Sequence, residues 1–369
     1  MLKSPGVLSR ALPLAAAAFA VASVPALAQE PVPAPSPAPE PKIDVTGFVD
    51  VYYEYNFNRA DPALRSFDVQ HNTFSLSLAE VAFAKTVSTD SRVGFRADLD
   101  FGKTADLVAA FEPAEDGKEV YKHVQQAYLS VLAGDKLQLD FGKFVTPHGA
   151  EVIESQDNWN YSRSVLFGYA IPFYHLGVRA TMPVNDKLSV AGLVVNGWNN
   201  SSEIYGDVPC LALQVTLKPS SKVTWLANYM AGQELPDETA DTRHLFDTTL
   251  TLSLTSKLTV MANYDYGKEG DASWSGIAAY AKVQVRPAWT LAGRFEYLDD
   301  DDGRFMTIGQ TAKTLTLTSD HLVAGALKLR LEYRGDFADH PFFVNDKGVL
   351  KDSQSAVLVG LVYAFGGRI

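Results

Sequence analysis

From Ile43 to the C-terminus, apolar and polar residues alternate along the chain with a period of two. In residues 45–57 one face is mainly apolar and aromatic, whereas the other carries acidic and amide side chains. Residues 92–101, 258–266 and 327–334 repeat this alternation. A period of two is typical of β-strands that have one face in an apolar environment. Segments of about ten residues also have the length that a tilted membrane-spanning strand needs.

Short and long breaks alternate between these segments. Seven short, turn-rich breaks lie at residues 88–91, 133–136, 183–187, 219–222, 255–257, 286–288 and 323–326. Eight long polar breaks lie at residues 59–70, 102–121, 144–173, 199–207, 233–243, 268–273, 299–310 and 338–353. This sorting predicts an all-β fold, a transmembrane antiparallel up-and-down β-barrel of about 16 strands with short periplasmic turns and long external loops. A barrel of this size leaves a water-filled lumen.

Aromatic residues cluster at the ends of the predicted strands. Such clusters indicate girdles at the two membrane interfaces, where amphipathic rings are favoured. The girdle on the long-loop side would contain Tyr53, Tyr55, Phe57, Phe101, Trp198, Tyr229, Tyr264, Tyr266 and Tyr297. The girdle on the short-turn side would contain Trp225, Trp289, Tyr363 and Phe365.

The N-terminal segment has the features of an export signal. Lys3 and Arg10 precede or flank an alanine-rich apolar stretch, and residues 26–28 read Ala-Leu-Ala, as at a signal-peptidase site. We therefore expect a signal peptide at residues 1–28, followed by a Pro/Ala-rich periplasmic linker at residues 29–42 and the barrel at residues 43–369. The apolar stretch is too short for a spanning helix.

The chain is acidic, with 32 Lys and Arg residues against 43 Asp and Glu residues. A negative balance argues against nucleic acid as a partner, because nucleic-acid binding requires a basic surface. It favours the entry of cations, whereas arginines on the predicted polar strand face oppose this preference. Cys210 is the only cysteine, so neither an internal disulfide nor a thiolate metal cluster can form.

Four sequence stretches resemble the β-barrel porin-2 (OmpL-like) family. They are QAYLSVLAGDKLQLDFGKFVTPHGAE, NYSRSVLFGYAIPFYHLGVRA, VVNGWNN and LKLRLEYRGDF. The resemblance covers nearly all of the mature chain, and residues 142–149 and 196–198 carry its most specific motifs. It implies an outer-membrane barrel that forms a passive pore, and it supplies no substrate. Barrels of this kind usually end on an aromatic residue, but here Phe365 is followed by four more residues, which we expect to extend the last strand.

The polar face of the strands would line the lumen. Charged side chains are tolerated on a wet face, and rings of charge determine ion selectivity. We expect the pore lining to contain Arg96, Asp98, Asp140, Arg179, Asp265, Arg294, Glu296, Arg330, Glu332 and Arg334. The alternative is that these charges are spread along the pore and only keep it hydrated.

The longest loop, residues 144–173, is unusually apolar for a solvated loop. We expect it to fold into the lumen and narrow it. Its charged residues Glu151, Glu154, Asp157 and Arg163 would then lie opposite the arginines of the wall. The alternative is a loop at the rim that packs on a neighbouring protomer.

These patterns predict a cell-outer-membrane porin that allows passive diffusion of small hydrophilic solutes and ions. No catalytic motif, metal-ligand spacing or cofactor motif is found, and the run Asp299–Asp302 does not match a calcium loop. The expected partners are outer-membrane lipid, lipopolysaccharide, small hydrophilic solutes and, by analogy with sixteen-stranded porins, two further copies in a homotrimer. The alternatives are a non-conducting structural or adhesive barrel and an outer-membrane barrel enzyme.

Overall fold

The computed structural model describes residues 42–112, 115–206, 208–234, 241–300, 302–306 and 308–368. The predicted signal peptide and nearly all of the predicted linker lie outside the described residues. No helix in the described part of the chain is long and apolar enough to cross a membrane.

Sixteen antiparallel strands form a closed barrel, which confirms the predicted fold class and strand number. Each strand pairs with its neighbour in the sequence, apart from the closing pair. The strands are β1 (Asp44–Asn56), β2 (Thr73–Lys85), β3 (Val93–Phe101), β4 (Val124–Ala133), β5 (Leu137–Val145), β6 (Tyr174–Asn185), β7 (Leu188–Val195), β8 (Cys210–Ser220), β9 (Val223–Gln233), β10 (Thr242–Ser253), β11 (Leu258–Glu269), β12 (Ala272–Arg286), β13 (Trp289–Asp300), β14 (Gln310–Ala324), β15 (Leu327–Ala338) and β18 (Ser353–Arg368).

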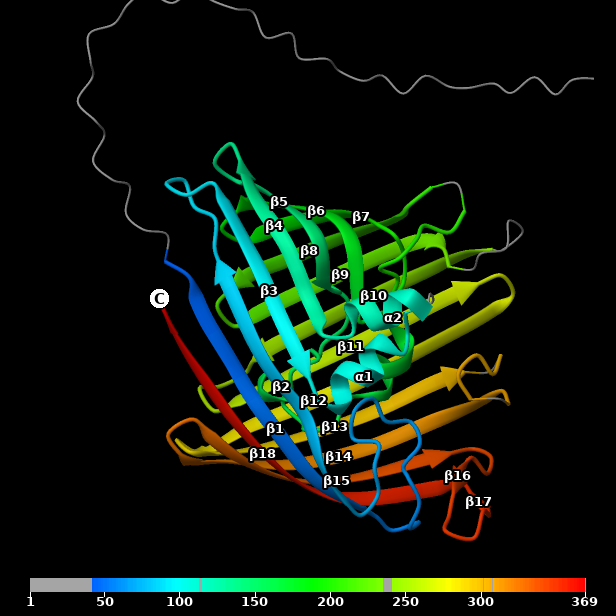
Figure 1. Cartoon of the computed structure of the whole chain (residues 1–369). Helices are drawn as coiled ribbons and strands as arrows, with labels where there is room; N and C mark the ends of the chain where they lie inside the picture. The colour runs from blue at the N-terminus through cyan, green and yellow to red at the C-terminus, as the bar shows by residue number, and fades with distance from the viewer. Residues whose placement is uncertain are drawn as a thin grey trace, which may run out of the picture. The chain divides into compact units, whose positions relative to one another are not determined.

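The barrel closes between its first and last strands. Figure 1 shows β18, drawn in red, beside β1, drawn in blue. The pairing runs without a shift from Asp44 opposite Arg368 to Asn56 opposite Ala356. β18 therefore continues three residues beyond Phe365, in agreement with the extension expected from the sequence. Closure leaves no unpaired strand edge facing hydrocarbon, where such an edge would be costly.

The two faces of the wall are sorted as the alternation predicts. On β1, Asp50 and Glu54 point inward and are buried, whereas Val49 and Val51 point outward and are about 40% exposed. The other strands repeat this arrangement, so that an apolar outer surface surrounds a polar interior. A soluble protein would hide such an outer surface, but a barrel presents it to lipid.

All seven predicted short turns are present, and seven of the eight predicted long breaks are long loops. The exception is residues 268–273, where β11 and β12 are joined by only Gly270 and Asp271. Gly270 has a φ of +60°, a conformation that glycine adopts without strain and that is common in two-residue hairpins. The polar residues around this turn belong to the strands because the rim of the barrel is wet.

The long loops contain the remaining short elements. α1 (Lys103–Ala109) and α2 (Glu115–Tyr121) lie between β3 and β4. The 3₁₀ turn η1 (Ser155–Asp157) and the single π-helical turn η2 (Leu166–Ala170) lie between β5 and β6, and the small hairpin of β16 (Phe343–Val344) and β17 (Leu350–Lys351) precedes β18. We call residues 146–173, between β5 and β6, the lumen loop.

Candidate functional site: the lumen and the loop inside it

A ladder of buried ion pairs covers the inner wall formed by β13, β14 and β15. Arg294 Nε lies 2.9 Å from Glu296 Oε2, Arg330 Nη2 lies 2.9 Å from Asp320 Oδ2, and Arg334 Nε lies 2.7 Å from Asp336 Oδ1. The three guanidinium groups belong to residues that are only 1% exposed. They face inward together because every second residue of a strand points to the same side.

The lumen loop covers this ladder and binds to it. The carboxylate of Glu332 accepts hydrogen bonds from the backbone N–H groups of Tyr161 and Ser162, at 2.6 and 2.9 Å. Arg294 pairs with Glu151 of the loop at 2.8 Å and donates to the carbonyl oxygen of Ser162 at 2.6 Å. Charged hydrogen bonds of this kind are stronger than neutral ones, particularly where water is excluded.

Two more wall arginines hold the backbone of the loop. Arg330 donates to the carbonyl oxygen of Asn158 at 2.8 Å, and Arg334 donates to that of Arg163 at 2.6 Å. The side chain of Arg163 turns back to the carbonyl oxygens of its own loop and lies over the ring of Phe67. These arginines therefore serve as anchors for the loop.

The lumen loop also bonds strands outside this ladder, both next to it and across the barrel. The hydroxyl group of Tyr161 donates to Asp50 on β1 at 2.7 Å, and Glu154 accepts a hydrogen bond from Gln125 on β4. The carbonyl oxygen of Pro147 accepts hydrogen bonds from Gln214 on β8 and Asn228 on β9, both at 3.1 Å. One loop thus contacts strands distributed around the whole circumference.

Burial shifts the pKa values of two loop side chains. Burial raises the pKa of Glu154, because a charged carboxylate loses hydration there. Burial, with a smaller effect from His175, lowers the pKa of His148 to about 3. Thr146 and His148 are joined by a 3.0 Å hydrogen bond, and Thr146 also bonds His175. The base of the loop is therefore a compact group in which His148 is neutral.

The inner wall formed by β3 to β6 is more open to solvent. Arg96 pairs with Asp98 at 2.8 Å and its side chain is 39% exposed, whereas Arg179 pairs with Asp140 at 2.8 Å and its side chain is 20% exposed. Solvent therefore reaches this arc of the wall. Arg179 also lies over the ring of Phe144, with 4.7 Å between the guanidinium carbon and the ring centroid.

All ten predicted pore-lining residues point inward, but the structure divides them into groups. Arg96, Asp98, Asp140 and Arg179 lie on the arc described above. Arg294, Glu296, Arg330, Glu332 and Arg334 lie beneath the lumen loop and bind it. Asp265 is buried beside Asn263 on β11, apart from both groups. Of the four charged loop residues, Asp157 is exposed and the other three form the loop contacts already described.

A second loop, residues 57–72, also lies inside the barrel. The sequence pattern predicted this segment only as a long external loop. Arg65 is buried and pairs with Asp68 at 3.0 Å and with Asp336 on β15 at 3.2 Å. The ring of Phe67 packs against those of Phe167 and Phe173, at centroid distances of 6.1 and 5.8 Å. In the sequence, only the apolar Phe67 and the opposite charges of Arg65 and Asp68 beside it indicate that this loop is buried.

A cavity of 270 Å³ on the long-loop side is lined by an aromatic residue that the sequence pattern places in the outer girdle. Trp198 lines this cavity with Trp274, Arg243 and Arg304, and the guanidinium carbon of Arg243 lies 5.0 Å from its ring centroid. Trp198 follows the end of β7, and in that position a residue need not keep the inward–outward alternation of the strand. Its assignment to the girdle is therefore wrong.

The run of aspartates that begins at the end of β13 has a structural role. Asp300 is buried and its carboxylate accepts hydrogen bonds from the backbone N–H groups of Arg304, Phe305 and Met306. Its side chain thereby shapes the loop. Among the described residues, no group of three or more metal-ligating side chains is found.

The fold is similar to those of several solved porins and outer-membrane proteins. The outer membrane channel DcaP of Acinetobacter baumannii matches with a TM-score of 0.59 and 14% identity, covering 88% of this chain and 97% of that one. The anion-selective porin from Comamonas acidovorans matches with a TM-score of 0.59 and 12% identity, covering 88% and 99%. The trimer form of OmpT of Vibrio cholerae matches with a TM-score of 0.58 and 11% identity, covering 88% and 99%.

Comparison with curated protein sequences gave no match. A family model does match, over residues 42–365, which is nearly the whole barrel and both loops inside it. This match and the sixteen-stranded closed barrel together locate the protein in the outer membrane. The chain belongs to the porin family described as "Putative beta-barrel porin-2, OmpL-like".

Proposed function

We propose that this porin allows passive diffusion of small hydrophilic solutes and ions, and that the lumen loop forms its constriction. The path for solutes would run between the loop and the arc of wall that carries Arg96, Asp98, Asp140 and Arg179. Glu151, Glu154, Asp157 and Arg163 would belong to the constriction, and the remaining inward arginines would hold the loop in place.

One observation carries this proposal. The lumen loop is bonded to β15 through Glu332, to β1 through Asp50, to β4 through Gln125 and to β8 through Gln214. A segment attached at these four places crosses the barrel, and it reduces the cross-section that is left for solutes. The partly exposed side chains of Arg96 and Arg179 support a water-filled path on this side.

Conductance in a planar lipid bilayer tests the proposal directly. Refolded protein is expected to give discrete ohmic steps. Replacement of residues 150–165 by a short Gly-Ser linker is expected to raise the conductance of each step, because it removes the segment that crosses the lumen.

A matched control shortens the β16–β17 hairpin by removing residues 345–349, which lie in a different loop. This deletion is expected to leave the size of the conductance steps nearly unchanged. Equal conductance of the two deletion variants and the wild type would contradict the constriction. Silence from folded wild-type protein would contradict the porin proposal and favour a structural barrel or a barrel enzyme.

We also propose that the protein assembles as a homotrimer in contact with outer-membrane lipid and lipopolysaccharide. The trimer form of the OmpT structure supports this assembly, as does the apolar outer surface of the barrel. Light scattering of the detergent-solubilised protein, corrected for bound detergent, is expected to give three times the chain mass. A monomer mass across detergents would contradict the trimer.

A further inference from the structure

Charge is distributed unevenly between the two mouths of the barrel. At the short-turn mouth several basic side chains take part in no ion pair with another described residue, namely Lys136, Lys187, Lys218, Lys222, Lys257 and Arg286. Asp135, one of the few acids there, is paired with Arg92 at 3.4 Å. The other mouth carries exposed acids such as Glu203 and Asp271. The protein is acidic as a whole, but the rim of its short-turn mouth is basic.

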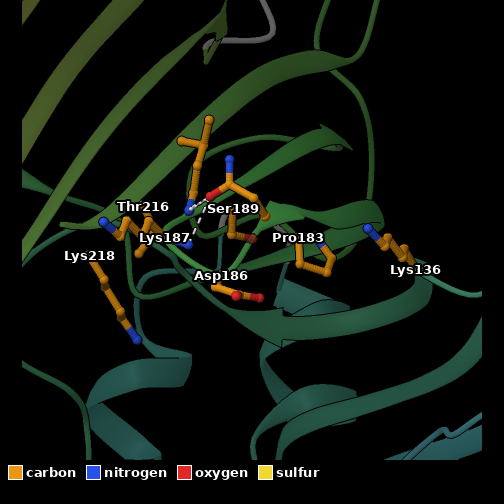
Figure 2. Close-up of a pocket in the computed structure, with 9 residues that line it drawn as sticks. Lys136, Pro183, Asp186, Lys187, Ser189, Thr216 and Lys218 are labelled. Carbon is orange, nitrogen blue, oxygen red and sulfur yellow. Dashed lines mark hydrogen bonds between the residues drawn. The ribbon is translucent and has the colours of Figure 1, made fainter. Parts of the chain in front are cut away.

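Three of these lysines surround one cavity. The cavity has a volume of 390 Å³ and lies at the short-turn ends of β5 to β8, where Lys136, Lys187 and Lys218 line it (Figure 2). Two further lining residues, Ser189 and Thr216, are paired neighbours on β7 and β8. Thr216 and Lys218 follow the buried Ala212 at even spacing on β8, so they belong to the lumen face of that strand.

The backbone holds two of the lysines side by side. The N–H group of Lys218 donates to the carbonyl oxygen of Lys187 at 2.7 Å. The side chain of Asn185 accepts hydrogen bonds from the N–H groups of Lys187 and Leu188, at 2.9 and 3.1 Å, and so holds the turn in shape. The side chain of Lys187 is therefore presented by an ordered turn.

The balance of charge in this cavity points to an anionic ligand. The three lysines share this cavity with a single acid, Asp186, and Asp140 on the adjoining β5 is already paired with Arg179. Three cationic side chains around one cavity give it a positive potential, which favours anions there. A ligand with several negative oxygens would accept hydrogen bonds from the ammonium groups and from the hydroxyl groups of Ser189 and Thr216.

We propose that this cavity, the short-turn cavity, binds polyvalent phosphate groups, either those of a free phosphorylated solute or those of a lipid headgroup. In the first case the channel concentrates phosphorylated solutes at its inner mouth. That consequence rests on the proposed porin function, whereas the binding itself does not. The negative net charge of the protein does not exclude an anion site here, because most of the acidic side chains lie away from the short-turn mouth.

Binding is measured first, without reference to conduction. Tripolyphosphate is titrated by calorimetry into the full-length barrel in a neutral detergent. The variant K136Q/K187Q/K218Q is expected to lose affinity by about tenfold or more, equivalent to at least about 1.4 kcal/mol. The matched variant K222Q/K257Q/R286Q loses three basic charges from the same rim but leaves the cavity intact, and it is expected to lose less than about threefold.

The outcomes separate the possibilities. Equal losses of affinity in the two variants would contradict a specific site and indicate that the positive charge of the whole rim attracts the anion. Absence of binding to folded wild-type protein would also contradict the site.

In bilayers, tripolyphosphate added on the short-turn side is expected to interrupt the wild-type current and not that of K136Q/K187Q/K218Q. If cardiolipin, an anionic lipid with two phosphate groups, competes with tripolyphosphate for the wild-type protein, the lipid headgroup is the occupant; if it does not compete, the occupant is a free phosphorylated solute. If binding persists but no current is seen, the porin proposal fails and the site stands.

Discussion

At the scale of single residues, the inner wall depends on charges that are buried in pairs. Arg294 has Glu296 beside it on β13 and Glu151 of the lumen loop at its other side, and none of the three side chains is more than 3% exposed. A buried ion pair contributes little net stability as a whole, but the loss of one partner leaves an uncompensated charge away from water. The consequences of substitution are therefore asymmetric.

We expect Arg294→Gln to destabilise the folded barrel by about 3 to 5 kcal/mol, because two carboxylates are left without their cation. The measurement is the urea midpoint of the heat-modifiable folded band on a gel. Arg368→Gln removes an arginine from the exposed Asp44 pair at the rim and should change that midpoint little. Equal midpoints for the two variants would show that the buried ion pairs contribute no more to the stability of the barrel than the exposed pair does.

His148 provides a test of acid sensitivity. Its pKa of about 3 in the folded loop lies below the usual value of about 6.5. Between these two values the undocked loop binds a proton that the docked loop does not, so docking weakens as the pH falls, by about 2 to 3 kcal/mol at pH 4.5. His148→Asn removes this contribution. The difference in thermal midpoint between pH 7.5 and pH 4.5 should be smaller in the variant, and an unchanged difference would rule out His148 as its source.

At the scale of the elements, β5 carries a glycine that its pairing with β4 requires. Gly142 has a φ of +139°, and a Cβ added there would overlap the carbonyl oxygen of Ala127 on β4. Gly192 on β7, by contrast, would place a Cβ in open space. Both glycines lie within strands, so they form a matched pair.

We expect Gly142→Ala to lower the yield of folded barrel strongly, because the strand must distort to admit the methyl group. Gly192→Ala should refold at least as well as the wild type, since alanine reduces the freedom of the unfolded chain. The yield is measured as the fraction of heat-modifiable protein after refolding into detergent. Similar yields for both variants would show that β4 and β5 tolerate the overlap.

Strand number and the inward set of residues could be predicted because both follow from a period of two and from the spacing of breaks. The inward position of Arg96 or Glu332 needs only the parity of the strand. The docking of the lumen loop could be suspected from its apolar content, but its partners could not be identified. Glu332 lies 171 residues from Tyr161, and no local pattern links residues so far apart. For the same reason the pairing of Arg65 with Asp336 could not be predicted. Trp198 was placed wrongly because it follows the end of β7, where the alternation of the strand no longer applies.

At the scale of the whole molecule, the two mouths of the barrel differ in sign of charge. Such an arrangement should rectify ionic current, because counterions of opposite sign accumulate at the two ends. We expect an asymmetric current–voltage curve in 0.1 M KCl that becomes nearly symmetric in 1 M KCl, where screening shortens from about 10 Å to about 3 Å. A symmetric curve for oriented channels in 0.1 M KCl would contradict the sorting of charge. Substitution of both sets of rim lysines should weaken the rectification.

The pairing of β1 with β18 has a consequence for when the barrel can fold during synthesis. The strand made first has as one of its partners the strand made last, so the cylinder cannot be completed while the ribosome is still at work. Until then the chain has two unsatisfied edges and an apolar exterior, which are hazards in water. We therefore expect the polypeptide to reach the membrane unfolded and bound to chaperones. A polypeptide truncated before β18 cannot close the barrel and should form no pore.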